Sequence, residues 1–312
     1  MIKKILLVFV SVLVFVSCSN NTTSPNSSNN SGVTDSTVEE QELIKKYGID
    51  ISQEDALISQ QIEQNLKAYF AEKNSYRVIL TGTPKDYSNN ESLYTLVLKA
   101  ALKVSSSMNI ELDIKNINFQ DGSVKTGMFS GEGIKNSENI VINFTFPTDK
   151  IKTIEMMSFD QLYNTKEITL PDSIITIKEM AFQNSQSIEK LTLGKNVQTI
   201  GDQAFFTLEF LKELIIPNSL KSIGMAAFAQ SETIEKITIP ASLTSVGMGA
   251  FSSCPNLTTV IYYGTSPSSI NNNDALMYCN KLKTLILPNA DTLDAGVWSS
   301  FLGGNFTDIR KQ

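Results

Sequence analysis

Residues 214–228, with the sequence LIIPNSLKSIGMAAF, decide the fold because their apolar positions recur along the chain at one spacing. The Ala-Phe pair that closes this stretch occurs four times, 23 residues apart, at Ala181, Ala204, Ala227 and Ala250. The other apolar columns keep that spacing: Ile168, Leu191, Leu214, Ile237 and Val260; Ile174, Val197, Leu220 and Leu243; Ile177, Ile200, Ile223 and Val246. A fixed period of this length predicts a solenoid, in which each copy buries its apolar face against the next.

Each copy contains a short segment with alternating apolar residues, such as 168–170, which predicts a β-strand. A proline, which cannot donate to a continuing ladder, ends this segment in four copies: Pro171, Pro217, Pro240 and Pro288. The Ala-Phe stretch is too short for a long helix and predicts a single turn whose phenylalanine belongs to the core. With an earlier copy from Phe144 and a longer copy at Ala275, the repeats are expected over residues 144–292.

The pattern resembles the BspA-like class of leucine-rich repeats found in bacterial surface proteins. The copy that resembles it most runs from Pro217 through Ile223-Gly224 to Ala227-Phe228. The resemblance implies an α/β fold: a right-handed solenoid with a parallel β-sheet on the concave face and helical or irregular turns on the convex face. Known members of the class are implicated in adhesion and host-factor binding. The resemblance therefore implies a binding or adhesion module that is not an enzyme.

The first residues predict secretion. Lys3 and Lys4 precede an apolar segment, residues 5–16, which is too short for a permanent membrane span, so residues 1–17 are expected to be a signal peptide. Ser17 and Cys18 at its end resemble the lipobox of bacterial lipoproteins, in which the cysteine is lipidated. A membrane attachment through Cys18, at the outer membrane or cell surface, is therefore expected. The alternative is an ordinary signal peptide followed by an incidental cysteine.

The segments that flank the repeats complete the expected organisation. Residues 18–37 are rich in Asn, Ser and Thr and predict a disordered tether. Residues 38–74 are expected to be a helical cap over the open N-terminal end, and residues 75–143 irregular β-α-β turns that lead into the repeats. Residues 293–312 are expected to cap the other end.

Single residues support these assignments. Ser52 is a plausible N-cap for a helix with one apolar stripe: Ile58, Ile62, Leu66 and Phe70. Met128-Phe129 is interpreted as an early echo of the Ala-Phe pair, and Trp298 with Phe301 is expected to close the C-terminal end.

Composition excludes several classes of function. The chain has 26 basic and 32 acidic residues, which argues against a nucleic-acid partner. It has no histidine, which excludes Ser-His or Cys-His catalysis and His-ligated zinc. We find no phosphate-binding loop, dinucleotide fingerprint or calcium loop, and expect no cofactor and no metal. Two alternatives stay open: a periplasmic structural or scaffolding lipoprotein, and a hydrolase that uses only carboxylates.

Cys254 and Cys279 are expected at the same place in successive copies, since each lies three residues after the Ala-Phe pair or its Ala-Leu equivalent. Stacked turns would bring their Cα atoms within reach of a disulfide. The other interpretation, two small buried residues, is also open, because Ser185, Leu208 and Ser231 fill this column elsewhere.

A binding surface for a protein or glycan ligand is expected on the concave sheet toward the C-terminal end. The residues assigned to it are Ile215, Thr238, Ile261 and Ile286 in one outward column, Thr259 and Thr284 before them, and Tyr263 in place of the proline. The column becomes more apolar along the chain. The alternative is that the Ser-Pro-Ser loop of the longer copy folds over Ile261 and Ile286 and buries them.

Charged residues precede the strands in two columns of alternating sign: Glu167, Lys190, Glu213 and Lys236; Lys166, Glu189, Lys212 and Glu235. Neighbouring turns about 4.8 Å apart would then present opposite charges, which predicts a ladder of surface ion pairs.

Overall fold

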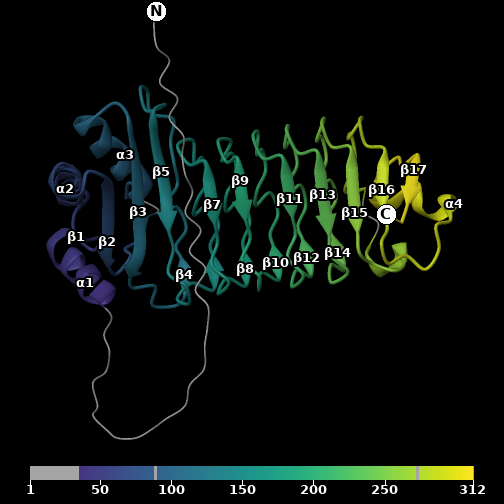
Figure 1. Ribbon diagram of the computed structural model, residues 1–312, viewed down its shortest axis with the longest axis horizontal. Helices are drawn as coiled ribbons and strands as arrows, with labels where there is room; N and C mark the ends of the chain where they lie inside the picture. Colours follow the sequence, from purple (N-terminus) through teal and green to yellow (C-terminus); the bar gives the residue numbers. More distant parts are fainter. Residues whose placement is uncertain (1–34, 88–89, 272–273, 312) are drawn as a thin grey trace, which may run out of the picture. The chain divides into compact units, whose positions relative to one another are not determined.

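The computed structural model describes residues 35–87, 90–271 and 274–311 (Figure 1). The predicted signal peptide, Cys18 and most of the predicted tether lie outside these residues. By its internal contacts the chain divides into Met1–Glu40 and Gln41–Gln312, and the second unit contains all the repeats. The first helix begins at Asp35, so residues 35–37 are helical and do not belong to a tether. The predicted boundary at residue 37 was wrong because it was based on composition. Once a helix has formed, adding a further residue to its end costs little free energy.

A parallel four-stranded sheet forms the N-terminal part of the second unit, in the order β1-β2-β3-β5. Its elements and their neighbours are α1 (Asp35–Tyr47), β1 (Gly48–Asp50), α2 (Asp55–Lys73), β2 (Tyr76–Gly82), α3 (Leu93–Val104), β3 (Met108–Ile117) and β5 (Ile140–Thr145). The predicted strand, helix and strand correspond to β2, α3 and β3. Residues 38–74, expected to be a helical cap, contain most of α1 and all of α2, but also strand β1, which was not predicted.

Helix α2 begins later than expected. Its N-cap is Glu54, and Ser52 donates its backbone N–H and its hydroxyl to Asp50 Oδ1 at 2.9 and 2.7 Å instead of capping a helix. Strand β1 ends at Asp50, so Ser52 is needed in the turn that follows the strand.

The apolar stripe of α2 is only partly buried. Ile58, Ile62 and Leu66 are fully buried, but Phe70 is exposed and stacks on Tyr76 with ring centroids 4.6 Å apart. Because β1 and β2 pair in parallel, α2 forms the crossover between them. Its role as a cover for the open end of the solenoid stays a prediction.

The repeats build two sets of parallel strands, which Figure 1 shows as an upper and a lower row. We call the upper set the wide wall: β7 (Glu167–Thr169), β9 (Lys190–Thr192), β11 (Glu213–Ile215), β13 (Lys236–Ile239), β15 (Thr259–Tyr262), β16 (Thr284–Ile286) and β17 (Asp308–Arg310). The lower set is the narrow wall: β4 (Ser123–Val124), β6 (Thr153–Ile154), β8 (Thr176–Ile177), β10 (Thr199–Ile200), β12 (Ser222–Ile223) and β14 (Ser245–Val246). The narrow wall is one continuous sheet, whereas the wide wall consists of two, β7-β9 and β11-β13-β15-β16-β17.

A ladder of phenylalanines fills the core between the turns. Phe159, Phe182, Phe205 and Phe228 are fully buried, and neighbouring rings stack nearly parallel with centroids 4.9, 5.0 and 5.1 Å apart. Phe129 stacks on Phe159 at 5.3 Å, which confirms the early echo of the Ala-Phe pair. Together with the pairing of β4 and β6, this stacking shows that the solenoid begins before the predicted boundary at residue 144.

Glycines in the repeat allow successive turns to approach closely. A Cβ atom on Gly224 would lie 2.4 Å from the backbone nitrogen of Asp202, and one on Gly247 would lie 2.4 Å from that of Met225. Neither glycine has a positive φ. Glycine is therefore required at these positions because a side chain would clash with the preceding turn, and not because the backbone is left-handed.

The C-terminal segment continues the wide wall. After η1 (Pro267–Ser269), the chain forms α4 (Ala295–Trp298), η2 (Phe301–Gly303) and β17. Trp298 and Phe301 are buried, and both rings lie against Tyr262, at 6.1 and 4.8 Å. Strand β17 pairs with β16, so the segment expected only to cap the repeats also adds a strand to them.

Candidate binding surface

The predicted surface residues lie in one sheet. Register partners place Ile215 beside Thr238, Thr238 beside Ile261, and Ile261 beside Ile286. Thr259 pairs with Thr284, and Tyr263 follows β15 directly. The alternate residues of these strands, Leu214, Ile237, Val260 and Leu285, are fully buried, so the predicted column points away from the core.

Exposure varies along this column. The side chain of Ile215 is 63% exposed and that of Tyr263 is 39% exposed, whereas Ile261 and Ile286 are half-buried. Beyond them, β17 places Arg310 beside Ile286 and Asp308 beside Thr284. Thr284 donates its hydroxyl to Asp308 Oδ2 at 3.1 Å, and Arg310 forms an ion pair with the same carboxylate at 3.3 Å. The strip expected to be uncharged therefore ends in charged residues, because a further strand joins the sheet.

The loop of the longer copy is held at the narrow wall. Asn271 donates its backbone N–H to Thr244 O at 3.3 Å, and its side chain accepts from Val246 N and donates to Val246 O, at 2.6 and 3.1 Å. The loop thus continues the narrow wall next to β14, and Ile261 and Ile286 keep part of their surface exposed.

The structure reveals an opening that the sequence did not predict. Strands β9 and β11 belong to different sheets, and no hydrogen-bonded pairing joins them in the described part of the chain. A cavity of about 1020 Å³ lies there, lined by residues of both strands and by Phe210. Leu191 on β9 is partly exposed, whereas its equivalents in the neighbouring turns, Ile168 and Leu214, are buried.

Two residues of the turn at the opening differ chemically from their equivalents in other copies. Thr233 and Asn256 in later copies donate side-chain hydrogen bonds of 2.8 Å to backbone carbonyls of the preceding turn, Glu209 O and Glu232 O. The equivalent residue here is Phe210, whose side chain cannot donate a hydrogen bond and is 53% exposed.

Leu208, two residues earlier, is the second of these residues. The equivalent Ser185 donates to Phe159 O at 2.9 Å and so links two turns. Leu208 has no such group and fills the column with a larger, fully buried side chain. Both residues are visible in the sequence, but each is an ordinary apolar residue, and neither one predicts an opening.

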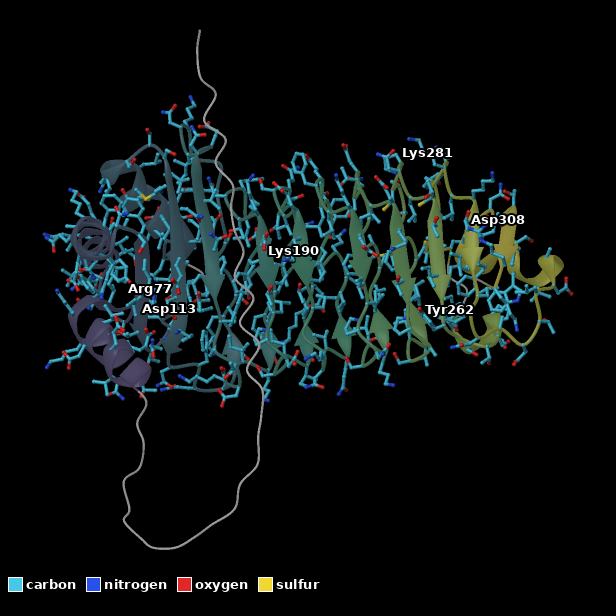
Figure 2. The ribbon with its side chains drawn as sticks, viewed as in Figure 1. Arg77, Asp113, Lys190, Tyr262, Lys281 and Asp308 are labelled. Atoms are coloured by element: carbon cyan, nitrogen blue, oxygen red, sulfur yellow. The ribbon has the colours of Figure 1, made fainter. Side chains whose placement is uncertain are left out.

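Three steps of the charged columns form ion pairs, whereas Lys212 and Glu235 form none within the described residues. Lys166 with Glu189, Glu167 with Lys190, and Glu213 with Lys236 pair at 3.0, 3.5 and 2.5 Å, which confirms three steps of the predicted ladder. Lys190 is labelled on β9 in Figure 2. Across the opening no ion pair links Glu189 to Lys212 or Lys190 to Glu213, although all four residues are described.

The two cysteines occupy equivalent places, as expected. Cys254 and Cys279 are buried free thiols, and their sulfurs lie 3.6 Å from Phe228 O and 3.2 Å from Phe251 O, carbonyls of equivalent residues in successive turns. A hydrogen bond with the Cys279 thiol, together with burial, raises the pKa of Cys254. The burial of both cysteines agrees with the interpretation as two small buried residues, and the disulfide stays a prediction.

Buried charge in the described residues is concentrated away from this surface. Asp113 on β3 is fully buried and accepts from Arg77 Nη2 at 2.6 Å (Figure 2). Within the described residues, no acidic or cysteine side chains cluster in a way that could hold a metal ion. Over the same residues, every helix is too short or too polar to cross a membrane.

The repeats match a family model described as the BspA type leucine-rich repeat region, in 6 copies, over residues 135–258 and 206–301. Comparison with the curated proteins gives no match. Among solved structures, a leucine-rich-repeat protein of T. pallidum is 25% identical with a TM-score of 0.42, over 50% of this chain and 70% of that one. A leucine-rich-repeat protein of Bacteroides ovatus is 18% identical with a TM-score of 0.37, over 77% and 72%. The pneumococcal vaccine antigen PcpA is 16% identical with a TM-score of 0.30, over 67% and 69%.

Proposed function

Because this chain belongs to the family of BspA-type leucine-rich-repeat proteins, we propose that it is a non-catalytic binding or adhesion module displayed on a lipid anchor. The ligand is a protein or a glycan that contacts the outward face of the wide wall. The observation that carries this proposal is the row of apolar side chains, Ile215, Ile261 and Ile286, that stays exposed or half-buried in one column of a sheet. Apolar groups gathered on one face of a rigid sheet are typical of a contact surface.

The chemistry of the described residues supports binding over catalysis. The chain has no histidine, and the fully buried carboxylate of Asp113 is held by Arg77. A carboxylate-only hydrolase needs two acidic groups that face each other across a substrate. A periplasmic structural lipoprotein remains the second candidate, since the same anchor and the same repeats serve either location.

Replacing both Ile261 and Ile286 with glutamate is expected to weaken ligand binding by at least about 30-fold, because two charges would have to be buried at the contact. A panel of immobilised proteins and glycans, probed with the purified chain, measures this effect. Thr169→Glu is the matched control, since it places the same charge at the same column position on β7, away from the patch. Unchanged binding by the double variant would move the contact site elsewhere, and a wild-type chain that binds no panel member would contradict the proposal.

The anchor has its own test. We expect Cys18→Ala to transfer the protein from the membrane fraction to the soluble fraction, or to leave it unprocessed, because the lipid chains would be its only membrane attachment. Fractionation followed by mass spectrometry of the N-terminus measures both results. Membrane retention of a correctly cleaved variant would exclude the anchor. Protease treatment of intact cells then separates a surface protein, which is cleaved, from a periplasmic one, which is protected.

A further inference from the structure

The opening between β9 and β11 presents two strand edges that face each other. Leu170 N–H on the β7 side donates to Thr192 O at 2.9 Å, so the main-chain groups of Thr192 point toward β7. The N–H and C=O groups of successive residues point to opposite edges of a strand. The N–H and C=O groups of Leu191 and Leu193 therefore point toward the opening. On β11, Ile216 N–H donates to Thr238 O on the β13 side at 3.4 Å, so by the same alternation Ile215 faces β9.

The side chains around these edges form an apolar groove. Leu191 on one side and Ile215 and Phe210 on the other are partly or largely exposed and line the cavity of about 1020 Å³. An extended peptide can bind a protein by adding a strand to a free sheet edge, and such sites have exposed apolar side chains beside the edge. The main chain of an added segment provides affinity, and pockets for its alternate side chains provide specificity.

One charge at the rim is available to a ligand. Lys212 is exposed and forms no ion pair within the described residues, whereas Lys190 and Glu213 at the same opening pair with Glu167 and Lys236. A ligand that enters here would gain from a carboxylate placed near the start of β11.

From these observations we infer that the opening between β9 and β11 binds an extended peptide segment of a partner protein. The segment pairs with the free strand edges through its main chain, places alternate apolar side chains against Leu191, Phe210 and Ile215, and sets an acidic residue beside Lys212. The inference goes beyond the proposed contact surface, because it names a different mode of binding and a site that shares only Ile215 with that surface.

The probe that tests this site is a fluorescein-labelled peptide of sequence EITITIT, which alternates apolar and polar side chains after one carboxylate. We expect saturable binding to the intact chain in fluorescence anisotropy. The same peptide with N-methylated amides, which keeps its side chains but cannot donate main-chain hydrogen bonds, should bind at least about tenfold more weakly. Ile215→Glu should abolish binding, and Lys212→Glu should weaken it about threefold.

The control variant is Ile261→Glu combined with Ile286→Glu, which should bind the peptide as the wild type does and so separates this site from the proposed contact surface. Because Ile215 is largely exposed, Ile215→Glu should keep the thermal unfolding curve of the wild type. Hydrogen exchange gives a second readout: the amides of Leu191, Leu193 and Ile215 should become protected when peptide is added. Absent binding, equal affinity for the N-methylated peptide, or unprotected amides at saturation would each overturn the inference.

Discussion

Replacing Phe205 with alanine is expected to lower the free energy of unfolding by about 3–5 kcal/mol. The side chain is fully buried in the middle of the ladder, and its ring stacks on Phe182 at 5.0 Å and on Phe228 at 5.1 Å. Removing it leaves a cavity that two neighbouring turns cannot close, because their backbones are tied by hydrogen bonds from Phe182 N to Ala204 O and from Phe205 N to Ala227 O. Urea denaturation monitored by circular dichroism measures the change.

Phe210→Ala is the matched control, since it removes the same side chain five positions later at a site that is 53% exposed. Its effect should stay within about 0.5 kcal/mol. A loss of less than roughly 1 kcal/mol for Phe205→Ala would show that the ladder is not the stabilising core of the repeats.

Replacing Asp113 with alanine is expected to cost about 3–5 kcal/mol of stability, because it removes the partner of a nearly buried cation. Asp113 is fully buried and accepts from Arg77 at 2.6 Å, and Arg77 is only 8% exposed. Glu111, at 3.4 Å from Arg77 Nε, is half-exposed and compensates less well. The measurement is again the urea unfolding curve.

Asp172→Ala gives the comparison at the surface. Asp172 pairs with Lys195 at 3.0 Å, and the Lys195 backbone N–H and ammonium lower the pKa of this carboxyl, but both side chains are exposed. We expect its unfolding midpoint to remain close to that of the wild type. Equal losses for the two variants would show that burial of the Arg77–Asp113 pair does not matter.

The repeat could be predicted from sequence because its information is local and redundant. The apolar columns at 23-residue spacing determine which residues face the core, and the prolines after β7, β11, β13 and β16 mark where those strands end. The outward column from Ile215 to Ile286 follows from the same alternation. Every copy has the same apolar pattern, so the repeat can be recognised even where one residue departs from it.

The N-terminal part lacked that redundancy. Strand β1 has only three residues, and α2 begins after a turn in which Asp50 accepts from Ser52, so a local N-cap signal pointed to the wrong residue. The early turn at Phe129 was recognisable only weakly, because 30 residues separate it from Phe159 where later copies have 23.

The sequence by itself determined the repeat, the buried phenylalanine ladder and the residues that face outward from the wide wall, because these depend on spacing within a copy. Only the tertiary structure decided that the wide wall divides between β9 and β11, that β17 adds Asp308 and Arg310 to the predicted strip, and that the longer loop continues the narrow wall. The physical reason is that pairing between turns depends on contacts between residues of different copies, which the spacing within one copy does not determine. Hydrogen bonds link most turns to the next, but β9 and β11 stay unpaired although both have the alternating sequence of strands. Leu208 and Phe210, in the turn between them, lack the side-chain donors of Ser185 and Thr233.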